Sequence, residues 1–204
     1  MTADISRILL ESKSLLLRDH RFNSGLPAPL YFDSDLIPPL YRALVIQALS
    51  EETRDLEYVA VAGVPTRGEP WAAFHADRNN KILLRIRKVQ KSYGTERLIE
   101  GLYNKGDRII LIDDTVTTGK TMVTHADKLT DAGLFVVACI SLLDFGFNIS
   151  IQNFQKNGYT GLSLSGLDDL KKSGAELGMI DDSLMARLSS WPAEAAKYFA
   201  QRCT

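Results

Sequence analysis

The sequence predicts an α/β fold with a mainly parallel central sheet, because short apolar runs alternate with segments of helical pattern. Three runs are almost continuously apolar, as strands buried on both faces of a parallel sheet are: 58–62, 108–112 and 134–140. A further β-rich run occupies 82–86. Helical segments alternate with the strands at 40–52, 70–78 and 119–132, and Asp131-Ala132-Gly133 predicts where the last one stops.

The two ends of the sequence predict further helices. Residues 3–18 have an amphipathic pattern, and helical patterns recur at 166–177 and 181–201. The chain has no internal repeat, no low-complexity tract and no obvious flexible linker. Since 204 residues suit one domain, we expect a single domain covering 1–204.

Composition and charge exclude several classes of protein. The 24 lysines and arginines nearly balance the 25 aspartates and glutamates, so overall charge gives no argument for a nucleic-acid or membrane partner. No apolar run approaches the roughly 20 residues that span a bilayer, and the N-terminus lacks a secretory pattern. Cys139 and Cys203 are expected to be free thiols. We therefore expect a cytoplasmic protein.

The most informative segment is Ile-Ile-Leu-Ile-Asp-Asp-Thr-Val-Thr-Thr-Gly-Lys-Thr at 109–121. An expected buried strand ends in Asp113 and Asp114, and a loop rich in hydroxyl groups then opens a helix. Ligands of open α/β sheets bind at the carboxyl ends of the strands, and the amides of such a loop suit a phosphate. Two carboxylates would repel a phosphate, so they indicate sugar hydroxyls or a hydrated Mg²⁺ beside it.

Two commoner phosphate motifs do not fit the segment. Gly119-Lys120-Thr121 ends like a Walker A loop, but Asp114 stands where that motif needs its first glycine, and GxGxxG occurs nowhere. A capped turn without function, with Asp114 or Thr115 as the helix cap, is the simpler alternative. Four apolar residues, two acids and then Thr-Thr-Gly at this spacing favour a phosphate site.

This run resembles the phosphoribosyl pyrophosphate motif of type I phosphoribosyltransferases. The resemblance implies their fold: a mainly parallel sheet flanked by helices, with a core at about 41–145 and a small hood made by about 1–40 and C-terminal elements. It implies that Asp113 and Asp114 hold the ribose hydroxyls, and that Asp114 takes part in catalysis. The loop implied to wrap the 5′-phosphate consists of Thr115, Val116, Thr117, Thr118, Gly119, Lys120 and Thr121. Lys120 replaces a commoner small residue and adds a cation.

Two other segments are expected to face the pyrophosphate. Thr66 and Arg67 lie in the turn after the first strand, where Arg67 beside Gly68 offers a bidentate donor to an anion. A polar, cationic segment follows the second strand at 85–97. Taken alone, both are ordinary surface segments. Next to a phosphate loop, such cations with Mg²⁺ would stabilise the departing pyrophosphate, and a lid would exclude water.

The cationic segment, Arg87-Lys88-x-x-Lys91-x-Tyr93-Gly94, resembles the catalytic loop of orotate phosphoribosyltransferases, and the similarity covers essentially the whole chain. It implies that this loop acts on the leaving group and that 87–97 reaches into the neighbouring subunit of a homodimer. It implies that Tyr31 and Phe32 stack on the base, that Thr117 hydrogen-bonds it, and that Phe145 lies beside it. It also implies that Mg²⁺ is held mainly by phosphoribosyl pyrophosphate and water, with no direct protein ligand.

Three residues depart from that pattern: Asn23 replaces a common Lys, Tyr93 a common His, and Phe145 a common Arg. The last change removes a charge-assisted bond to the orotate anion, worth roughly 1.5–3 kcal/mol. The leading hypothesis is transfer of phosphoribosyl to orotate in pyrimidine biosynthesis. A phosphoribosyltransferase for a less acidic base and a non-catalytic sensor of phosphoribosyl pyrophosphate stay open. Such sensors usually carry a DNA-binding domain, and about 20 residues before Ser24-Gly25 are too few for one.

Overall fold

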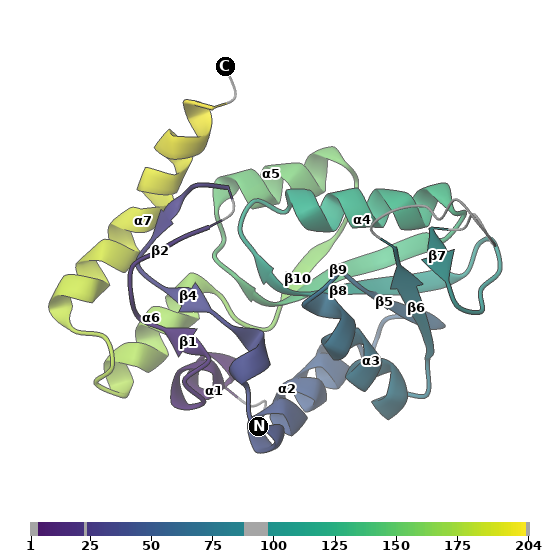
Figure 1. The fold of residues 1–204 in the computed structure, drawn as a ribbon, viewed down its shortest axis with the longest axis horizontal. Coiled ribbons are helices and arrows are strands. Elements are labelled where there is room, and N and C mark those ends of the chain that lie inside the picture. Colours follow the sequence, from purple (N-terminus) through teal and green to yellow (C-terminus); the bar gives the residue numbers. More distant parts are fainter. Residues whose placement is uncertain (1–3, 23, 88–97, 203–204) are drawn as a thin grey trace.

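The computed structural model describes residues 4–22, 24–87 and 98–202, and its centre is a six-stranded sheet (Figure 1). The strand order is β10-β9-β8-β5-β6-β7, and all neighbours are parallel except β6 and β7. The strands are β5 (Ala60–Gly63), β6 (Ile82–Ile86), β7 (Ile99–Glu100), β8 (Arg108–Val116), β9 (Phe135–Asp144) and β10 (Gly161–Ser163). The predicted α/β class with a mainly parallel sheet is confirmed.

Helices cover both faces of this sheet. Helices α4 (Lys120–Asp131) and α5 (Asn148–Lys156) lie on one face, and α2 (Pro39–Glu52) and α3 (Gly68–Arg78) on the other (Figure 1). The central strand β8 is apolar on both sides because Ile109 and Leu111 pack toward α4, whereas Ile110 and Ile112 pack toward α3. All four side chains are fully buried, which explains the continuous apolar run in the sequence.

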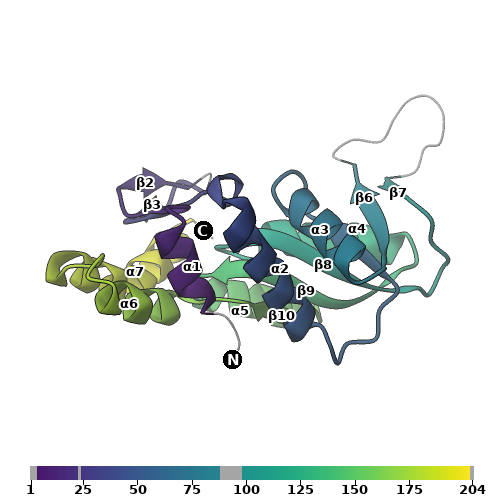
Figure 2. The same ribbon diagram turned by 90° about the horizontal axis from the view of Figure 1, so that it is seen from below.

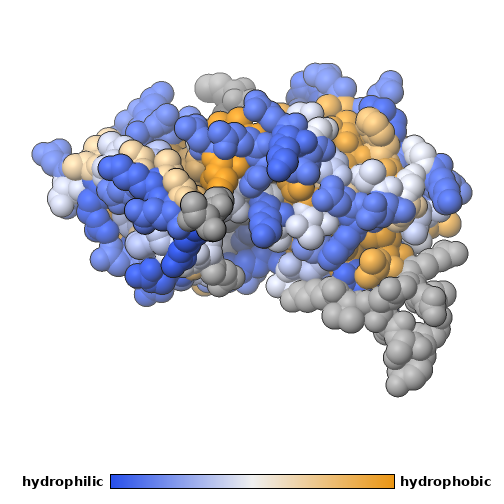
Figure 3. All heavy atoms as spheres, turned by 90° about the horizontal axis from the view of Figure 1, so that it is seen from above, coloured by the Kyte–Doolittle hydropathy of each residue, from blue (hydrophilic) through white to orange (hydrophobic). Residues whose placement is uncertain are grey.

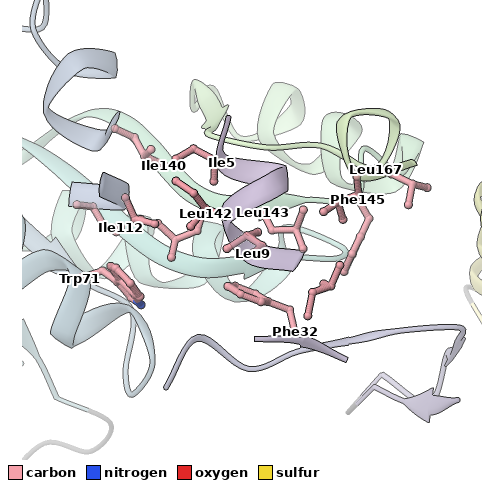
Figure 4. Packing of buried hydrophobic residues seen from close by; sticks show 14 of the residues in the cluster. Ile5, Leu9, Phe32, Trp71, Ile112, Ile140, Leu142, Leu143, Phe145 and Leu167 are labelled. Carbon is pink, nitrogen blue, oxygen red and sulfur yellow. The ribbon is translucent and has the colours of Figure 1, made fainter. Parts of the chain in front are cut away.

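A separate group of elements packs against one end of the sheet, which Figure 2 shows opposite β6 and β7. It contains α1 (Ile5–Glu11), β1 (Leu15–Leu16), β2 (His20–Arg21), β3 (Pro27–Ala28), β4 (Tyr31–Phe32), a 3₁₀ turn (Ser34–Leu36), α6 (Leu167–Glu176) and α7 (Asp182–Ala200). We call this group the hood. Strand β1 pairs with β4, and β2 with β3, both antiparallel. Figure 4 shows Leu9 and Phe32 of the hood packed with Ile112, Leu142 and Leu143 of the sheet, so the hood shares the main core.

The structure corrects two predicted boundaries. The first helix ends at Glu11, not near 18, because β1 then pairs with β4. Strand β8 continues to Val116 instead of ending at Ile112, since β9 keeps pairing with it up to Asp144. The acidic pair therefore lies within the strand. The hydrophobic pattern of the sequence also failed to predict the short strands β1 to β4, β7 and β10, and helix α5. These elements are too short to show a clear hydrophobic period.

The surface is mostly polar, with hydrophobic residues in small separate patches on the face seen in Figure 3. No helix within 4–22, 24–87 and 98–202 is long and apolar enough to cross a membrane. Cys139 is a buried free thiol on β9, and Cys203 lies outside the described residues.

Candidate active site

The acidic pair sits at the carboxyl end of β8, where it faces two different pockets. Side chains alternate along a strand, so Asp113 and Asp114 point to opposite sides of the sheet. Asp113 lines a pocket together with the loop that follows the strand. Asp114 lines a second pocket, together with hood residues. Both carboxyl groups are largely buried, with 8% and 7% of their surface exposed.

The first pocket is made mainly by consecutive residues of the predicted phosphate loop. Its lining consists of Phe22, Ser24, Asp113, Thr115, Val116, Thr117, Thr118, Gly119, Thr121 and Met122. The loop turns into α4 at Gly119, whose φ of +72° favours glycine. The N-terminus of α4 and the loop amides therefore meet at this pocket, an arrangement that suits a phosphate. Lys120 has an exposed side chain and is not part of the lining, unlike the other predicted loop residues.

Helix α5 supports this loop from behind. The side-chain amide of Asn153 donates to the carbonyl oxygen of Thr118 at 2.7 Å. A Cβ atom at Gly119 would lie 3.3 Å from the Phe154 ring and 3.4 Å from the carbonyl oxygen of Ser150. These contacts leave little room for the loop to move toward α5. None of these α5 residues was predicted, because nothing in the sequence places α5 beside the loop.

Burial raises the pKa of both aspartates. Burial and the neighbouring charge of Asp114 hold the pKa of Asp113 well above its usual range, although the Asp114 amide donates to Asp113 Oδ1 at 2.9 Å. Burial also raises the pKa of Asp114, and is opposed by a hydrogen bond from Ser34 Oγ at 3.0 Å and by the charge of Arg67. Sugar hydroxyls or a nearby cation would stabilise the ionised pair.

The second pocket joins the sheet to the hood. Its lining consists of His20, Arg21, Phe22, Tyr31, Phe32, Arg67, Asp114, Thr115 and Thr117. Tyr31 is half-buried and its ring lies 4.2 Å from that of His20, centroid to centroid. Phe32 is only 3% exposed, so Tyr31 offers more surface to a ligand here. The structure thus brings together Tyr31, Phe32 and Thr117, which we predicted to contact a base.

Arg67 lies in this second pocket, and its predicted contact with the pyrophosphate stays a prediction. Its guanidinium is 2.9 Å from Asp33 Oδ1 and 3.8 Å from Asp114, and it donates to the Tyr31 hydroxyl at 3.0 Å. The sequence analysis missed Asp33 and Ser34, which connect the hood to Arg67 and Asp114. Two polar residues directly after Tyr31-Phe32 were the available signal.

A third pocket lies on the other side of the β5 turn. It is lined by Pro65, Thr66, Glu69, Arg85, Ile86, Arg87 and Glu100. The peptide between Pro65 and Thr66, in the turn after β5, is cis. Arg87 forms an ion pair with Glu100, and its buried Nε has no hydrogen-bond partner within the described part of the chain. Lys88, Lys91 and Tyr93 lie outside the described residues, as does Asn23.

The structure places Phe145 in the core instead of beside a ligand. Its side chain is 2% exposed and lines none of the three pockets. Its ring centroid lies 5.7 Å from that of Phe22, 5.9 Å from Phe147 and 4.9 Å from Trp191. This corrects our prediction of a base contact, because Phe145 supports Phe22 instead, and Phe22 lines the first two pockets. We did not predict Phe22, although it is an aromatic residue just before Ser24-Gly25.

Comparisons with known proteins agree with this geometry. The phosphoribosyl transferase domain family matches residues 39–148, more than half of the chain. The orotate phosphoribosyltransferase of Coxiella burnetii is 31% identical, over 92% of this chain and 93% of the relative. That of Lactiplantibacillus plantarum is 30% identical, over 94% and 93%. Among solved structures, the orotate phosphoribosyltransferase of Aeropyrum pernix has a TM-score of 0.72 and 28% identity, over 85% of this chain and 99% of that one.

A longer protein also contains this fold. The UMP synthase of Leishmania donovani matches with a TM-score of 0.82 and 27% identity, over 94% of this chain and 42% of that one. The chain therefore belongs to the phosphoribosyltransferase family. The Coxiella burnetii, Lactiplantibacillus plantarum and Aeropyrum pernix relatives, which it matches along nearly their whole length, are orotate phosphoribosyltransferases, and this confirms the resemblance found in the sequence.

Proposed function

We propose that this protein transfers the 5-phosphoribosyl group from phosphoribosyl pyrophosphate to orotate, giving orotidine 5′-monophosphate and pyrophosphate in pyrimidine biosynthesis. The observation that carries the proposal is the end of β8. There, two buried carboxylates precede a loop whose amides meet the N-terminus of α4 in one pocket. Sugar hydroxyls suit the carboxylates, which accept hydrogen bonds, and a 5′-phosphate suits the loop amides and the N-terminus of α4.

The reaction breaks the bond between ribose C1′ and the pyrophosphate oxygen, and forms a bond between C1′ and a ring nitrogen of the base, whose proton passes to the pyrophosphate or to water. Positive charge develops on the ribose as the pyrophosphate leaves. Asp113 and Asp114 would accept hydrogen bonds from the ribose hydroxyls and place negative charge near that position. Tyr31 would stack on the base, and Thr117 would hydrogen-bond it, so that the nitrogen faces C1′.

The leaving pyrophosphate requires cations on the opposite side of the ribose. Thr66 and Arg87 line the third pocket, and the buried Nε of Arg87, which has no hydrogen-bond partner among residues 4–22, 24–87 and 98–202, is available as a donor. Lys88, Lys91 and Tyr93 follow Arg87 directly in the sequence and would complete this side of the site. We propose that these residues stabilise the charge on the departing group.

We also propose that the enzyme needs Mg²⁺. Asp113 and Asp114 are hard oxygen donors whose pKa values are raised by burial, and a nearby cation would help to ionise them, although they face different pockets and do not form one ligand set. We expect phosphoribosyl pyrophosphate and water to hold it mainly, with the carboxylates reached through water. When bound, Mg²⁺ would neutralise charge on the pyrophosphate.

A homodimer that shares segment 87–97 between subunits is part of this proposal. Large hydrophobic side chains are exposed on neighbouring elements: Leu40 of α2 is 74% exposed, Phe74 of α3 39% and Leu83 of β6 38%. Leu40→Glu should shift the protein toward monomer in analytical ultracentrifugation. Ile151→Glu, on exposed α5, is the control that should leave the oligomeric state unchanged. A buried free thiol, Cys139, supports a cytoplasmic location.

The test is an assay of the purified protein with phosphoribosyl pyrophosphate, Mg²⁺ and orotate, following orotate consumption and pyrophosphate release together. We expect both to proceed at the same rate, and to stop when Mg²⁺ is chelated. Transfer to uracil but not to orotate would replace the proposal with a transferase for a less acidic base, which the burial of Phe145 favours. Binding without turnover, unaffected by Lys91→Ala, would indicate a sensor.

A further inference from the structure

Orotate carries a carboxylate that uracil lacks, and a site that selects orotate needs a cation for it. The side chain at position 145 does not supply one, because it is a phenyl ring buried between Phe22 and Trp191. Two permanently charged residues, Arg21 and Arg67, line the second pocket. Their surroundings differ, and the difference indicates which of them is available to a substrate.

The charge of Arg67 is already matched by the protein. Its guanidinium forms an ion pair with Asp33 and lies 3.8 Å from Asp114. It also donates to the hydroxyl of Tyr31 at 3.0 Å. Burial lowers the pKa of Arg67, but the negative charges of its partners outweigh burial and raise it overall, and the same charges reduce its attraction for an incoming anion. A base carboxylate would have to compete with two aspartates that are held in place.

Arg21 has no acidic partner in the part of the chain that the structure describes. It lies on β2 with an exposed side chain, and forms no ion pair with any residue of the described ranges. Its Nη1 donates to the carbonyl oxygen of Gly25 at 2.7 Å. That bond fixes one end of the guanidinium at the rim of the pocket. The other nitrogens remain for a carboxylate, which an arginine can bind through two parallel hydrogen bonds.

The aromatic neighbours of Arg21 line one wall of the second pocket, which we call the slot. The rings of His20 and Tyr31 lie against each other with centroids 4.2 Å apart, so a planar base would stack on this pair, and Phe22 provides apolar surface next to Arg21. We propose that Arg21 is the specificity-determining residue of this protein, and that it binds the carboxylate of the base at the rim of this slot. This inference rests on the proposed function.

The test compares ligands that differ only in this carboxylate. Arg21→Gln should lower kcat/KM for orotate by roughly 10- to 100-fold, the loss expected for one charge-assisted hydrogen-bonded pair. The KM for phosphoribosyl pyrophosphate should not change. Arg21→Lys keeps the charge but loses the planar pair of donors, so its kcat/KM for orotate should lie between those of the unaltered protein and of Arg21→Gln. Arg18→Gln removes the same charge from an exposed hood position outside the pocket, and should behave like the unaltered protein.

Product binding gives a second readout that needs no turnover. Measured by calorimetry, Arg21→Gln should weaken the binding of orotidine 5′-monophosphate by the same factor. It should leave the binding of uridine 5′-monophosphate, which lacks the carboxylate, unchanged. Equal weakening of both products, or no weakening of either, would overturn the role of Arg21 while leaving the transferase intact. An unaltered protein that neither consumes orotate nor binds its nucleotide would overturn the proposed function, and this inference with it.

Discussion

The two faces of the end of β8 build their pockets in different ways. On the Asp113 side, the lining is mostly one continuous segment, 113–122, whose backbone turns at Gly119. On the Asp114 side, the lining comes from segments far apart in the sequence: 20–22, 31–32, Arg67 and 114–117. The first side depends on backbone shape, and the second on individual side chains. We call the Asp113 side the phosphate side and the Asp114 side the hood side. Enzyme activity should therefore be sensitive to changes of backbone conformation on the phosphate side and to changes of charge on the hood side.

The largest expected effect comes from the carboxylate that belongs to the hood side. Asp114→Asn keeps the shape but removes the charge that Ser34 and Arg67 support. We expect kcat/KM to fall by about 10²- to 10³-fold, the range for losing one preorganised electrostatic contact to a transition state. Asp35→Asn, in the exposed part of the 3₁₀ turn, is the control. Steady-state kinetics with both substrates would check this, and a loss below threefold would contradict the assigned role.

The backbone of the phosphate side can be tested with two glycines that share a φ of +72°. Gly119→Ala places a Cβ against Phe154 and Ser150, whereas a Cβ at Gly158 meets nothing within 4 Å. Both changes should cost about 1 kcal/mol of stability from the left-handed backbone. Gly119→Ala alone should raise the KM for phosphoribosyl pyrophosphate, by about tenfold if the loop shift costs a further 1.4 kcal/mol. Similar KM values for both variants would mean that the loop position does not matter.

A smaller effect is expected where α5 holds the loop. Asn153→Ala removes the hydrogen bond to the Thr118 carbonyl, which is worth about 1 kcal/mol. It should raise the KM for phosphoribosyl pyrophosphate about fivefold and leave kcat unchanged. Asn157→Ala removes the same kind of side-chain bond one turn later, to the carbonyl of Asn153, without touching the loop. It should leave the KM unchanged. A fall in kcat without a change in KM would contradict a positioning role.

The smallest effect concerns stability. The pKa of Asp113 is raised in the folded protein, so the folded state binds more protons than the unfolded one, and stability falls as pH rises from the unfolded pKa near 3.9 through the folded value. Asp113→Asn removes the free-energy cost of a buried ionised carboxylate. It should raise the Tm at neutral pH by about 2–4 °C for each kcal/mol of stability gained. The gain should vanish in acid, and differential scanning calorimetry across pH would check this. A lower Tm at neutral pH would contradict the argument.

The same contrast explains what the sequence could predict. The phosphate loop was predictable because Asp113 to Thr121 are consecutive, and their order alone indicates the chemistry. The hood side was predicted only in part, from the family resemblance of Tyr31, Phe32 and Thr117, because Phe22 and Asp33 meet Arg67 only after distant segments pack together. Phe145 was misplaced for the same reason. Its family position suggested a base contact, whereas the packing of Trp191 and Phe147 draws it into the core.

Helix α7 holds the hood side of the site in place, so it determines when that side can form during synthesis of the chain. Trp191 Nε1 donates to the carbonyl oxygen of Pro27 at 2.9 Å, and the Tyr198 hydroxyl donates to that of Ser24 at 3.1 Å. The β2–β3 hairpin is thus fastened by residues that leave the ribosome more than 160 positions later. A nascent chain can close its phosphate loop early, but its base-selecting slot has to wait until α7 emerges.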